Sequence, residues 1–267
     1  MRPTVRPPRP QSAWLAAFAL VACATSRPAS EARQGAPATS ARPDYAALVG
    51  SPDRLEEDRA LDAGRRPAEM LRFLQVRPGM RVADIGAAGG YTTELLARAV
   101  GPTGTVYAHN SSLLAAMVGD AWPQRLARPA MQRVVRVDRD LEDPLPPEAK
   151  GLDLVVMNAI YHDTIWLRTD RARMNKAIFD ALAPGGAFVV IDSSARPGMD
   201  IDEAAYELHR VDEKLVRDEV RAVGFRVEGE GDFLRNPSDA RDWNPAPNEA
   251  GARRGTSDRF ALRFVKP

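Results

Sequence analysis

The fold of this chain is decided by the ten residues from Val82 to Tyr91, which read VADIGAAGGY. The apolar run that ends at Asp84 and Ile85 predicts a buried strand, and a helical pattern begins just after the small residues. Glycine and alanine at such a turn let the backbone approach a ligand closely and adopt positive φ. The helix that follows offers free backbone N–H groups. The stretch therefore predicts a Rossmann-like strand, turn and helix that bind a nucleotide-type ligand.

Strand and helix patterns alternate along the chain around this turn. Strands are expected at residues 81–85, 105–108, 133–137, 152–157, 187–191, 225–229 and 259–265, and helices within 45–74 and at 92–100, 112–119, 170–182 and 212–223. This alternation predicts parallel βαβ units. Because no helical pattern separates the last two strands, we expect them to pair antiparallel. The prediction is an α/β fold with a mostly parallel seven-stranded sheet, an antiparallel last strand and helices on both faces.

The composition fits one large α/β domain. The chain has 267 residues, of which 44% are hydrophobic, so a sizeable core can form. Lys and Arg total 37 against 36 for Asp and Glu, and the net charge of +1 gives no reason to expect a nucleic-acid partner. The single cysteine, Cys23, excludes an internal disulfide and a zinc cluster built from cysteines.

Residues 1–23 have the pattern of an export signal. Three arginines without any acidic residue precede the apolar run Trp14 to Ala22, which has about half the length that a membrane-spanning helix needs. The sequence LVAC that ends at Cys23 resembles a bacterial lipobox, in which the cysteine carries the lipid anchor. We expect a periplasmic lipoprotein of the cell envelope, whose membrane contact is a lipid on Cys23. Simple cleavage with a soluble product, or a misplaced start codon and a cytosolic protein, are the alternatives.

A flexible tether is expected after this signal. Residues 24–43 are rich in Ala, Ser, Pro and Arg and show no apolar periodicity, so they bury too little surface to offset the entropy of ordering. Residues 44–267 then form the predicted domain, in which no transmembrane pattern occurs.

Four motifs in this domain together resemble those of class I S-adenosylmethionine (SAM)-dependent methyltransferases. The turn GAAGG from Gly86 to Gly90 is similar to the glycine motif of that class, with Ala88 in place of the middle glycine, and it does not fit the G-x-G-x-x-G of nicotinamide enzymes. The other three motifs are GPTGTVYA (101–108), VDRDL (137–141) and LAPGG (182–186). The resemblance covers about residues 66–195 and implies the Rossmann-like methyltransferase fold.

The resemblance implies SAM as the cofactor and assigns residues to it. Asp84 would lie near its amino-acid end, and Asn110 stands where the class has an acid that binds the ribose hydroxyls. An amide lacks the bidentate acceptor of a carboxylate. Asp140 would contact the adenine amino group, with Asp138 as the second choice. The predicted cofactor contacts are Asp84, Gly86, Ala88, Gly90, Asn110, Asp140, Leu141 and Asn158.

Three later segments carry a narrower resemblance. NAIYHD (158–163), LHRVD (208–212) and FLRNP (233–237) resemble a group of predicted bacterial methyltransferases that often carry export signals. This resemblance identifies a group without identifying a substrate.

Side chains that follow the fourth and fifth strands should face the crevice beyond the carboxyl ends of the sheet. His162 would be a general base near neutral pH, oriented by Asp163, while Arg210 and Arg235 would hold an anionic group. The alternative is that the histidines cap helices or form hydrogen bonds in loops. The predicted catalytic residues are Tyr161, His162, Asp163, His209 and Arg210.

A metal site built from His162, Asp163, Asp192 and His209 is the one candidate set, and no tight ligand spacing supports it, so we predict no metal. The leading hypothesis is an exported or lipid-anchored SAM-dependent methyltransferase that acts on a small-molecule or lipid acceptor. A Rossmann-like binding or accessory protein without transfer activity is the alternative, which Ala88 and Asn110 favour. A nicotinamide oxidoreductase is disfavoured by the missing glycine fingerprint.

Overall fold

The structure is a computed structural model that describes residues 42–267. The predicted export signal, the lipobox at Cys23 and nearly all of the predicted tether lie outside these residues. Within the described part of the chain, no helix is both long enough and apolar enough to cross a membrane.

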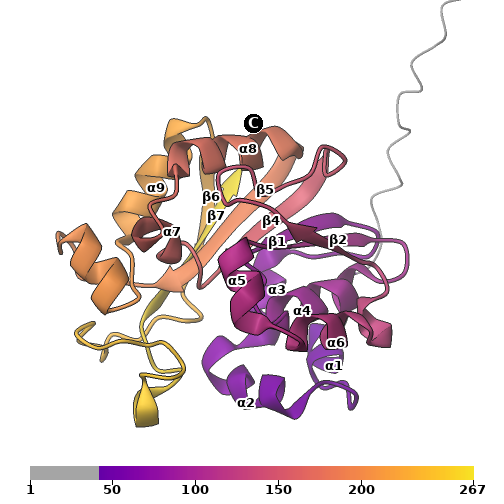
Figure 1. Cartoon of the computed structure of the whole chain (residues 1–267), viewed down its shortest axis with the longest axis horizontal. Helices are drawn as coiled ribbons and strands as arrows, with labels where there is room; N and C mark the ends of the chain where they lie inside the picture. Colours follow the sequence, from indigo (N-terminus) through magenta and orange to yellow (C-terminus); the bar gives the residue numbers. More distant parts are fainter. Residues whose placement is uncertain (1–41) are drawn as a thin grey trace, which may run out of the picture. The chain divides into compact units, whose positions relative to one another are not determined.

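Seven strands form one sheet in the described residues (Figure 1). They are β1 (Arg81–Ile85), β2 (Thr105–Asn110), β3 (Val134–Asp138), β4 (Leu152–Asn158), β5 (Leu182–Ser193), β6 (Arg226–Gly231) and β7 (Arg259–Val265). Their order across the sheet is β3-β2-β1-β4-β5-β7-β6. The first five in this order are parallel, whereas β7 pairs antiparallel with both β5 and β6. The predicted sheet and its antiparallel end are therefore confirmed.

Helices cover both faces of this sheet. They are α1 (Tyr45–Val49), α2 (Glu56–Arg65), α3 (Pro67–Leu74), α4 (Tyr91–Val100), α5 (Ser112–Val118), α6 (Ala121–Leu126), α7 (Asp163–Trp166), α8 (Arg171–Ala181) and α9 (Glu213–Ala222). Two 3-10 turns, η1 (Pro129–Met131) and η3 (Gly251–Arg253), and one π-helical turn, η2 (Glu203–Glu207), lie in the connections.

The core has two halves because strand side chains alternate between the faces of the sheet. Val155 and Met157 of β4 belong to the half that packs against α8 and α9, and Leu154 and Val156 belong to the half that packs against α3 and α4. Both β4 and β5 are buried on both faces, as their continuous apolar sequences predict. Figure 1 shows α8 and α9 on one side of the sheet and α3 and α4 on the other.

The helix α3 spans the predicted residues 67–74, with Pro67 in its first turn, where the missing N–H costs nothing. The short helices α6 and α7 and the π-helical turn were not expected. The strand β5 begins at Leu182, earlier than predicted, because the LAPGG stretch pairs with the start of β4 and with the segment after β7. Gly185 takes φ +78° within this stretch.

Candidate active site

The carboxyl ends of β1, β2, β4 and β5 meet at one edge of the sheet, where parallel α/β folds bind ligands. The first residue of β7, Arg259, pairs with Ser193 at the end of β5, so β7 begins at this same edge. The residues that end these strands and the turns that follow them form the candidate site.

The glycine turn after β1 has the backbone conformation that its sequence predicts. Gly86 and Gly90 have φ of +70° and +85°, and Ala88 also lies in the left-handed region at +46°. A Cβ at Gly86 would lie 2.4 Å from Cγ1 of Ile160, so Gly86 is required for packing. A Cβ at Gly89 would meet nothing within 4 Å, so the turn is open to a ligand at Gly89.

The end of β2 holds this turn in place. The Asn110 side chain accepts a hydrogen bond from Ala88 N at 2.8 Å and donates one to Ala88 O at 3.2 Å. His109 accepts from Gly86 N through Nδ1 at 3.3 Å, and its Nε2 donates to Arg139 O at 2.9 Å. Both side chains are fully buried, and burial lowers the pKa of His109 to about 4. Asn110 therefore fixes the turn and does not reach an open ribose site.

Asp84 is buried beneath the turn. Its Oδ2 accepts a hydrogen bond from Thr93 Oγ1 at 2.6 Å. Burial raises the pKa of Asp84 to about 7, and the Thr93 hydroxyl opposes this rise. With 2% of its surface exposed, Asp84 supports the turn from below, and any contact with a cofactor would be indirect.

A cavity of about 590 Å³ lies beside the glycine turn. Its wall includes the turn residues Ala87, Ala88 and Gly89 together with side chains of α2 and α6, among them Arg65, Asp58 and Arg125. This volume is in the range of small-molecule sites. Asp140 and Asp138 line a different cavity with Arg139, Glu142, Asp143 and Arg173, so the structure does not bring the predicted adenine contacts to the turn.

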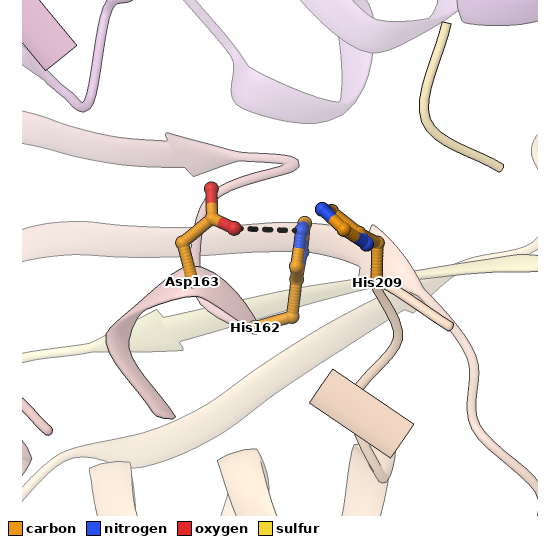
Figure 2. A group of neighbouring side chains, drawn as sticks. All are labelled: His162, Asp163 and His209. Carbon is orange, nitrogen blue, oxygen red and sulfur yellow. Dashed lines mark ion pairs between the residues drawn. The ribbon is translucent and has the colours of Figure 1, made fainter. Parts of the chain in front are cut away.

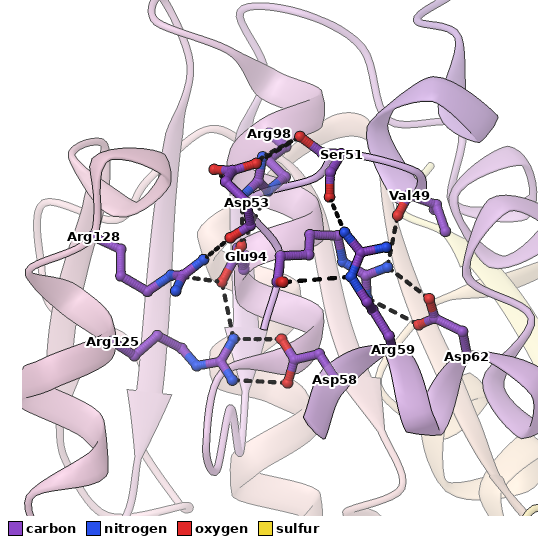
Figure 3. Close-up of polar contacts among 11 residues, drawn as sticks. Val49, Ser51, Asp53, Asp58, Arg59, Asp62, Glu94, Arg98, Arg125 and Arg128 are labelled. Atoms are coloured by element: carbon purple, nitrogen blue, oxygen red, sulfur yellow. Dashed lines mark hydrogen bonds and ion pairs between the residues drawn. The ribbon is translucent and has the colours of Figure 1, made fainter. Parts of the chain in front are cut away.

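A network of buried ion pairs holds the helices around this cavity (Figure 3). Arg125 of α6 binds Asp58 of α2 with two hydrogen bonds, at 2.7 and 2.8 Å, and contacts Glu94 of α4 at 3.0 Å. Arg54 binds Asp62 in the same bidentate way. Each of these charges is balanced within the network, which fixes α2 and α6 against the N-terminal half of α4.

A second cluster lies after β4 and β5 (Figure 2). The side chain of His162, just before α7, contacts Asp192 through Nδ1 at 2.8 Å and Asp163 through Nε2 at 3.1 Å. Asp192 also accepts the backbone N–H of His162 at 3.0 Å. Burial by itself would lower the pKa of His162, but the two carboxylates raise it to about 10. At neutral pH His162 is therefore an imidazolium that is hydrogen-bonded to Asp192 and ion-paired with Asp163, which does not suit the predicted role of general base.

His209 completes this cluster. Its ring centroid lies 5.4 Å from that of His162, and Figure 2 shows one ring nitrogen directed toward His162 and Asp163. Asn244 contacts Nδ1 of His209 through its amide nitrogen at 3.0 Å. The orientation of this amide is fixed, because its oxygen accepts from Ala246 N and its nitrogen donates to Glu207 O. Nδ1 of His209 therefore accepts, and the neutral ring carries its proton on Nε2.

His162, Asp163 and His209 bring three ligand atoms within 4.8 Å of one another, which is close enough to surround a metal ion. Two protons oppose that use. His162 would have to release the Nε2 proton that Asp163 accepts, and His209 would have to move its proton to the nitrogen that faces the Asn244 amide. The structure thus favours a protonated cluster, and the absence of a metal stays a prediction.

Three predicted site residues point away from the site. Tyr161 is fully buried and bonds Glu219 and Asn175 through its hydroxyl, because its side chain enters the core beside α8 and α9. Arg210 is also fully buried; its guanidinium binds Asp239 and the carbonyl oxygens of Ser194 and Trp243. These bonds leave the Arg210 guanidinium unable to hold an anionic substrate. The predictions that Tyr161 and Arg210 are catalytic residues are therefore corrected.

Leu141 is the third predicted site residue that points away from the site. Its side chain packs in the main core, with 3% of its surface exposed. Arg235 bonds Glu213 and Ser194, so its charge is also balanced. Asn158 donates to Thr92 Oγ1 at 3.0 Å and so joins the end of β4 to the first turn of α4, next to the glycine turn. No sequence pattern pointed to Asn244, because its loop has no periodicity.

The family comparison adds to this geometry. The family model described as protein-L-isoaspartate(D-aspartate) O-methyltransferase matches residues 43–197, which is more than half of the chain. The chain belongs to the protein-L-isoaspartate(D-aspartate) O-methyltransferase family.

Solved structures share the fold of this family member. A SAM-dependent methyltransferase from Aquifex aeolicus is similar with a TM-score of 0.56 at 16% identity, over 79% of this chain and 97% of that one. The arsenic(III) SAM methyltransferase of Chlamydomonas reinhardtii gives 0.53 at 17%, over 85% and 75%. The putative methyltransferase in complex with the Trm112 activator of Haloferax volcanii gives 0.53 at 18%, over 85% and 100%.

Family membership, together with the fold shared with SAM-dependent methyltransferases, implies SAM as the cofactor. The glycine turn fits this cofactor, because Gly89 is open and a cavity of about 590 Å³ lies against it. The backbone of Ala87 to Gly89 would hold SAM there, and SAM when bound supplies an electrophilic methyl group. Asn110 departs from the pattern of SAM-dependent methyltransferases, which have an acidic residue at this position, and its amide is bonded to Ala88.

Proposed function

We propose that this chain is a SAM-dependent methyltransferase whose acceptor atom is a carboxylate oxygen. The observation that carries the proposal is the lack of a free lone pair on either histidine of the cluster. Both His162 nitrogens face carboxylates, and Nδ1 of His209 accepts from Asn244. The activity for which the family is described, O-methyl transfer to L-isoaspartate or D-aspartate, supports the same acceptor class.

An alcohol or an ammonium group must lose a proton before or during methyl transfer, whereas a carboxylate is already an anion at neutral pH. A cluster whose histidines offer only N–H donors suits such an acceptor. The Nε2–H of His209 would donate to one carboxylate oxygen and leave the other free to attack. Catalysis would then come from positioning and from exclusion of water.

His162 would act as a fixed positive charge in this site. Asp192 positions it through two contacts, one to the ring and one to the backbone N–H. Arg259 adds a second positive charge next to Asp192, and across residues 42–267 no carboxylate forms an ion pair with it. Burial lowers the pKa of Arg259 to about 10, so the guanidinium stays charged at neutral pH.

The test is transfer of a labelled methyl group from SAM to a peptide that contains one isoaspartyl residue. A methyl ester forms if the acceptor is a carboxylate, and the label is then released by mild alkali. The same peptide with asparagine at that position is the matched control. A label that resists alkali would contradict the carboxylate, because methylated nitrogen and ether oxygen are stable under those conditions.

The second candidate function is that of a SAM-binding or accessory protein without transfer activity. The observation that favours it is Asn110, which stands at the predicted ribose position with both amide atoms bonded to Ala88. Binding of S-adenosylhomocysteine without turnover of any carboxylate peptide would support this function over the first.

Export and anchoring through Cys23 remain part of the proposal, supported by the arginines, the apolar run and the LVAC sequence. The carboxylate would belong to a small molecule, a lipid or a protein side chain, and no nucleic acid is expected. SAM is made in the cytoplasm, so an envelope location requires a supply of the cofactor. Mass analysis of the native protein tests the anchor, and an unmodified Cys23 would contradict it.

A further inference from the structure

The cavity beside the glycine turn contains an arginine that the fold leaves without a counter-ion. Arg65 is the last residue of α2 and is half-buried. Its guanidinium carbon lies 4.4 Å from the ring centroid of Tyr91, the first residue of α4. Arg65 lines the same cavity wall as Ala88 and Gly89. It is therefore placed beside the open part of the turn.

The other buried arginines near this cavity are paired. Arg125 binds Asp58 and Glu94, and Arg54 binds Asp62. Arg65 differs from them: across residues 42–267 no carboxylate forms an ion pair with it, and its guanidinium donates no hydrogen bond. The two acids of α2 nearest to Arg65 already bind other residues. Asp58 is hydrogen-bonded to Arg125, and Asp62 is hydrogen-bonded to Arg54 and to the Tyr91 hydroxyl.

A guanidinium has five N–H donors in a planar fork that matches a carboxylate. The Tyr91 ring covers one face of Arg65, which leaves the edge with its donors available to the cavity. Burial lowers the pKa of Arg65, so the positive charge has lost part of its hydration without gaining a partner. The charge of Arg65 also reaches Asp84 below the turn and Arg259 at the start of β7.

We propose that Arg65 is the carboxylate-binding residue of the cavity at the glycine turn. The proposal rests on the proposed function, because that function places SAM at this turn. The carboxylate has two possible sources, the amino-acid end of the cofactor and the acceptor. The Arg65 guanidinium, stacked on the Tyr91 ring, binds this carboxylate through charge-assisted hydrogen bonds at a cavity wall that is partly shielded from water.

Calorimetric titration of the full chain distinguishes the sources. S-adenosylhomocysteine carries the amino-acid carboxylate, and 5′-methylthioadenosine has the same nucleoside and thioether without it. We expect the wild type to bind the first more tightly. In Arg65→Met we expect affinity for S-adenosylhomocysteine to fall about 10-fold to 100-fold, while affinity for methylthioadenosine stays within about twofold. Arg65→Lys should retain part of the affinity.

The second arm titrates an isoaspartyl peptide into the chain saturated with methylthioadenosine. A loss in Arg65→Met that is confined to this peptide assigns the carboxylate to the acceptor, and a loss confined to S-adenosylhomocysteine assigns it to the cofactor. Arg72→Met is the control, because Arg72 is an exposed arginine of α3 outside this cavity wall. We expect it to change either affinity by less than about threefold.

The inference is overturned if Arg65→Met leaves all three affinities unchanged, or if it weakens methylthioadenosine as much as S-adenosylhomocysteine. The second result would mean that Arg65 only supports the shape of the cavity. If the wild type binds methylthioadenosine but gains nothing from the carboxylates, Arg65 fails while SAM as the cofactor stands. If the wild type binds none of the three, both proposals fail.

Discussion

Asn110 and Ala88 hold each other by two hydrogen bonds that run in opposite directions. The amide oxygen of Asn110 accepts from Ala88 N at 2.8 Å, and the amide nitrogen donates to Ala88 O at 3.2 Å. An amide can make both bonds, and a carboxylate can make only the first. The residue that departs from the methyltransferase pattern is therefore the one that this turn, with its left-handed alanine at φ +46°, requires.

Replacing Asn110 with Asp should separate stability from cofactor affinity. The new carboxylate would face Ala88 O without a proton to donate, so we expect the free energy of unfolding to fall by about 1–3 kcal/mol. Because the side chain at position 110 is buried against Ala88 and does not reach an open ribose site, affinity for S-adenosylhomocysteine should not rise. Urea unfolding and calorimetry measure the two effects. Asn110→Ala is the control, and it should lose stability without gaining affinity.

The free energy of unfolding should depend on pH because His162 holds a proton in the folded state. Its pKa is raised to about 10 from an ordinary 6.5, so the folded state holds a proton that the unfolded chain releases. This contribution is fully present below about pH 6.5 and is lost as the pH rises toward 10. His162→Gln should flatten the loss of stability over that range. An unchanged slope between pH 7 and 10 would show that His162 is not an imidazolium.

Asp84 should change the free energy of unfolding over a lower pH range than His162 does. Burial raises its pKa to about 7 from 3.8, so the folded state favours the protonated acid. The stability that this gives is present below about pH 4 and is lost as the pH rises through 7. Asp84→Asn keeps the side-chain volume and a bond to Thr93, so its unfolding free energy should vary less than that of the wild type between pH 4 and 7. Equal slopes in the two proteins would contradict a raised pKa.

The proton on His209 is one of the two protons that oppose metal binding by the cluster. In the wild type, Asn244 donates to Nδ1 and leaves the proton on Nε2, so we expect no saturable binding of Zn²⁺. Asp at position 244 would accept a proton from Nδ1 and free Nε2 for a ligand bond. Because Zn²⁺ must still displace the His162 proton, Asn244→Asp should gain weak Zn²⁺ binding that strengthens as the pH rises, measured by calorimetry with Asn248→Asp as the control in the same loop. Tight Zn²⁺ binding by the wild type would contradict the assigned tautomer.

The ion-pair network around the cavity should contribute strongly to folding. Arg125→Met leaves Asp58 buried without a cation and removes one of the three arginines that contact Glu94, and we expect a loss of about 3–5 kcal/mol in urea unfolding. Lys176→Met removes an exposed pair with Asp180 and serves as the control, with an expected loss below about 1 kcal/mol. A similar loss in both variants would mean that the Arg125 pairs do not differ from surface pairs.

The sheet could be predicted from the sequence because the residues within each strand show its apolar pattern. The apolar run of β4 needs no knowledge of distant residues, and the missing helix between β6 and β7 predicts their antiparallel pairing. The glycine turn was predictable for the same reason, since Gly86 and Gly90 adopt the positive φ that only glycine takes freely.

The site was predicted in part. The sequence placed His162 and Asp163 at the crevice but also placed Tyr161 there, and neighbouring residues of one chain point to different sides. The Asn244 contact that sets the tautomer of His209 joins residues 35 positions apart, and the Arg210 contacts with Asp239 and Trp243 join residues 29 and 33 apart. Such contacts depend on how loops pack over the sheet, which local patterns do not encode.

The most direct test of the central claim is calorimetric titration of the full chain with SAM and, in parallel, with NAD. We expect saturable binding of one SAM per chain and no binding of NAD, because the turn from Gly86 to Gly90 does not match the nicotinamide fingerprint. Binding of NAD in preference to SAM, or no heat with SAM at high concentration, would show that this turn is not a SAM site.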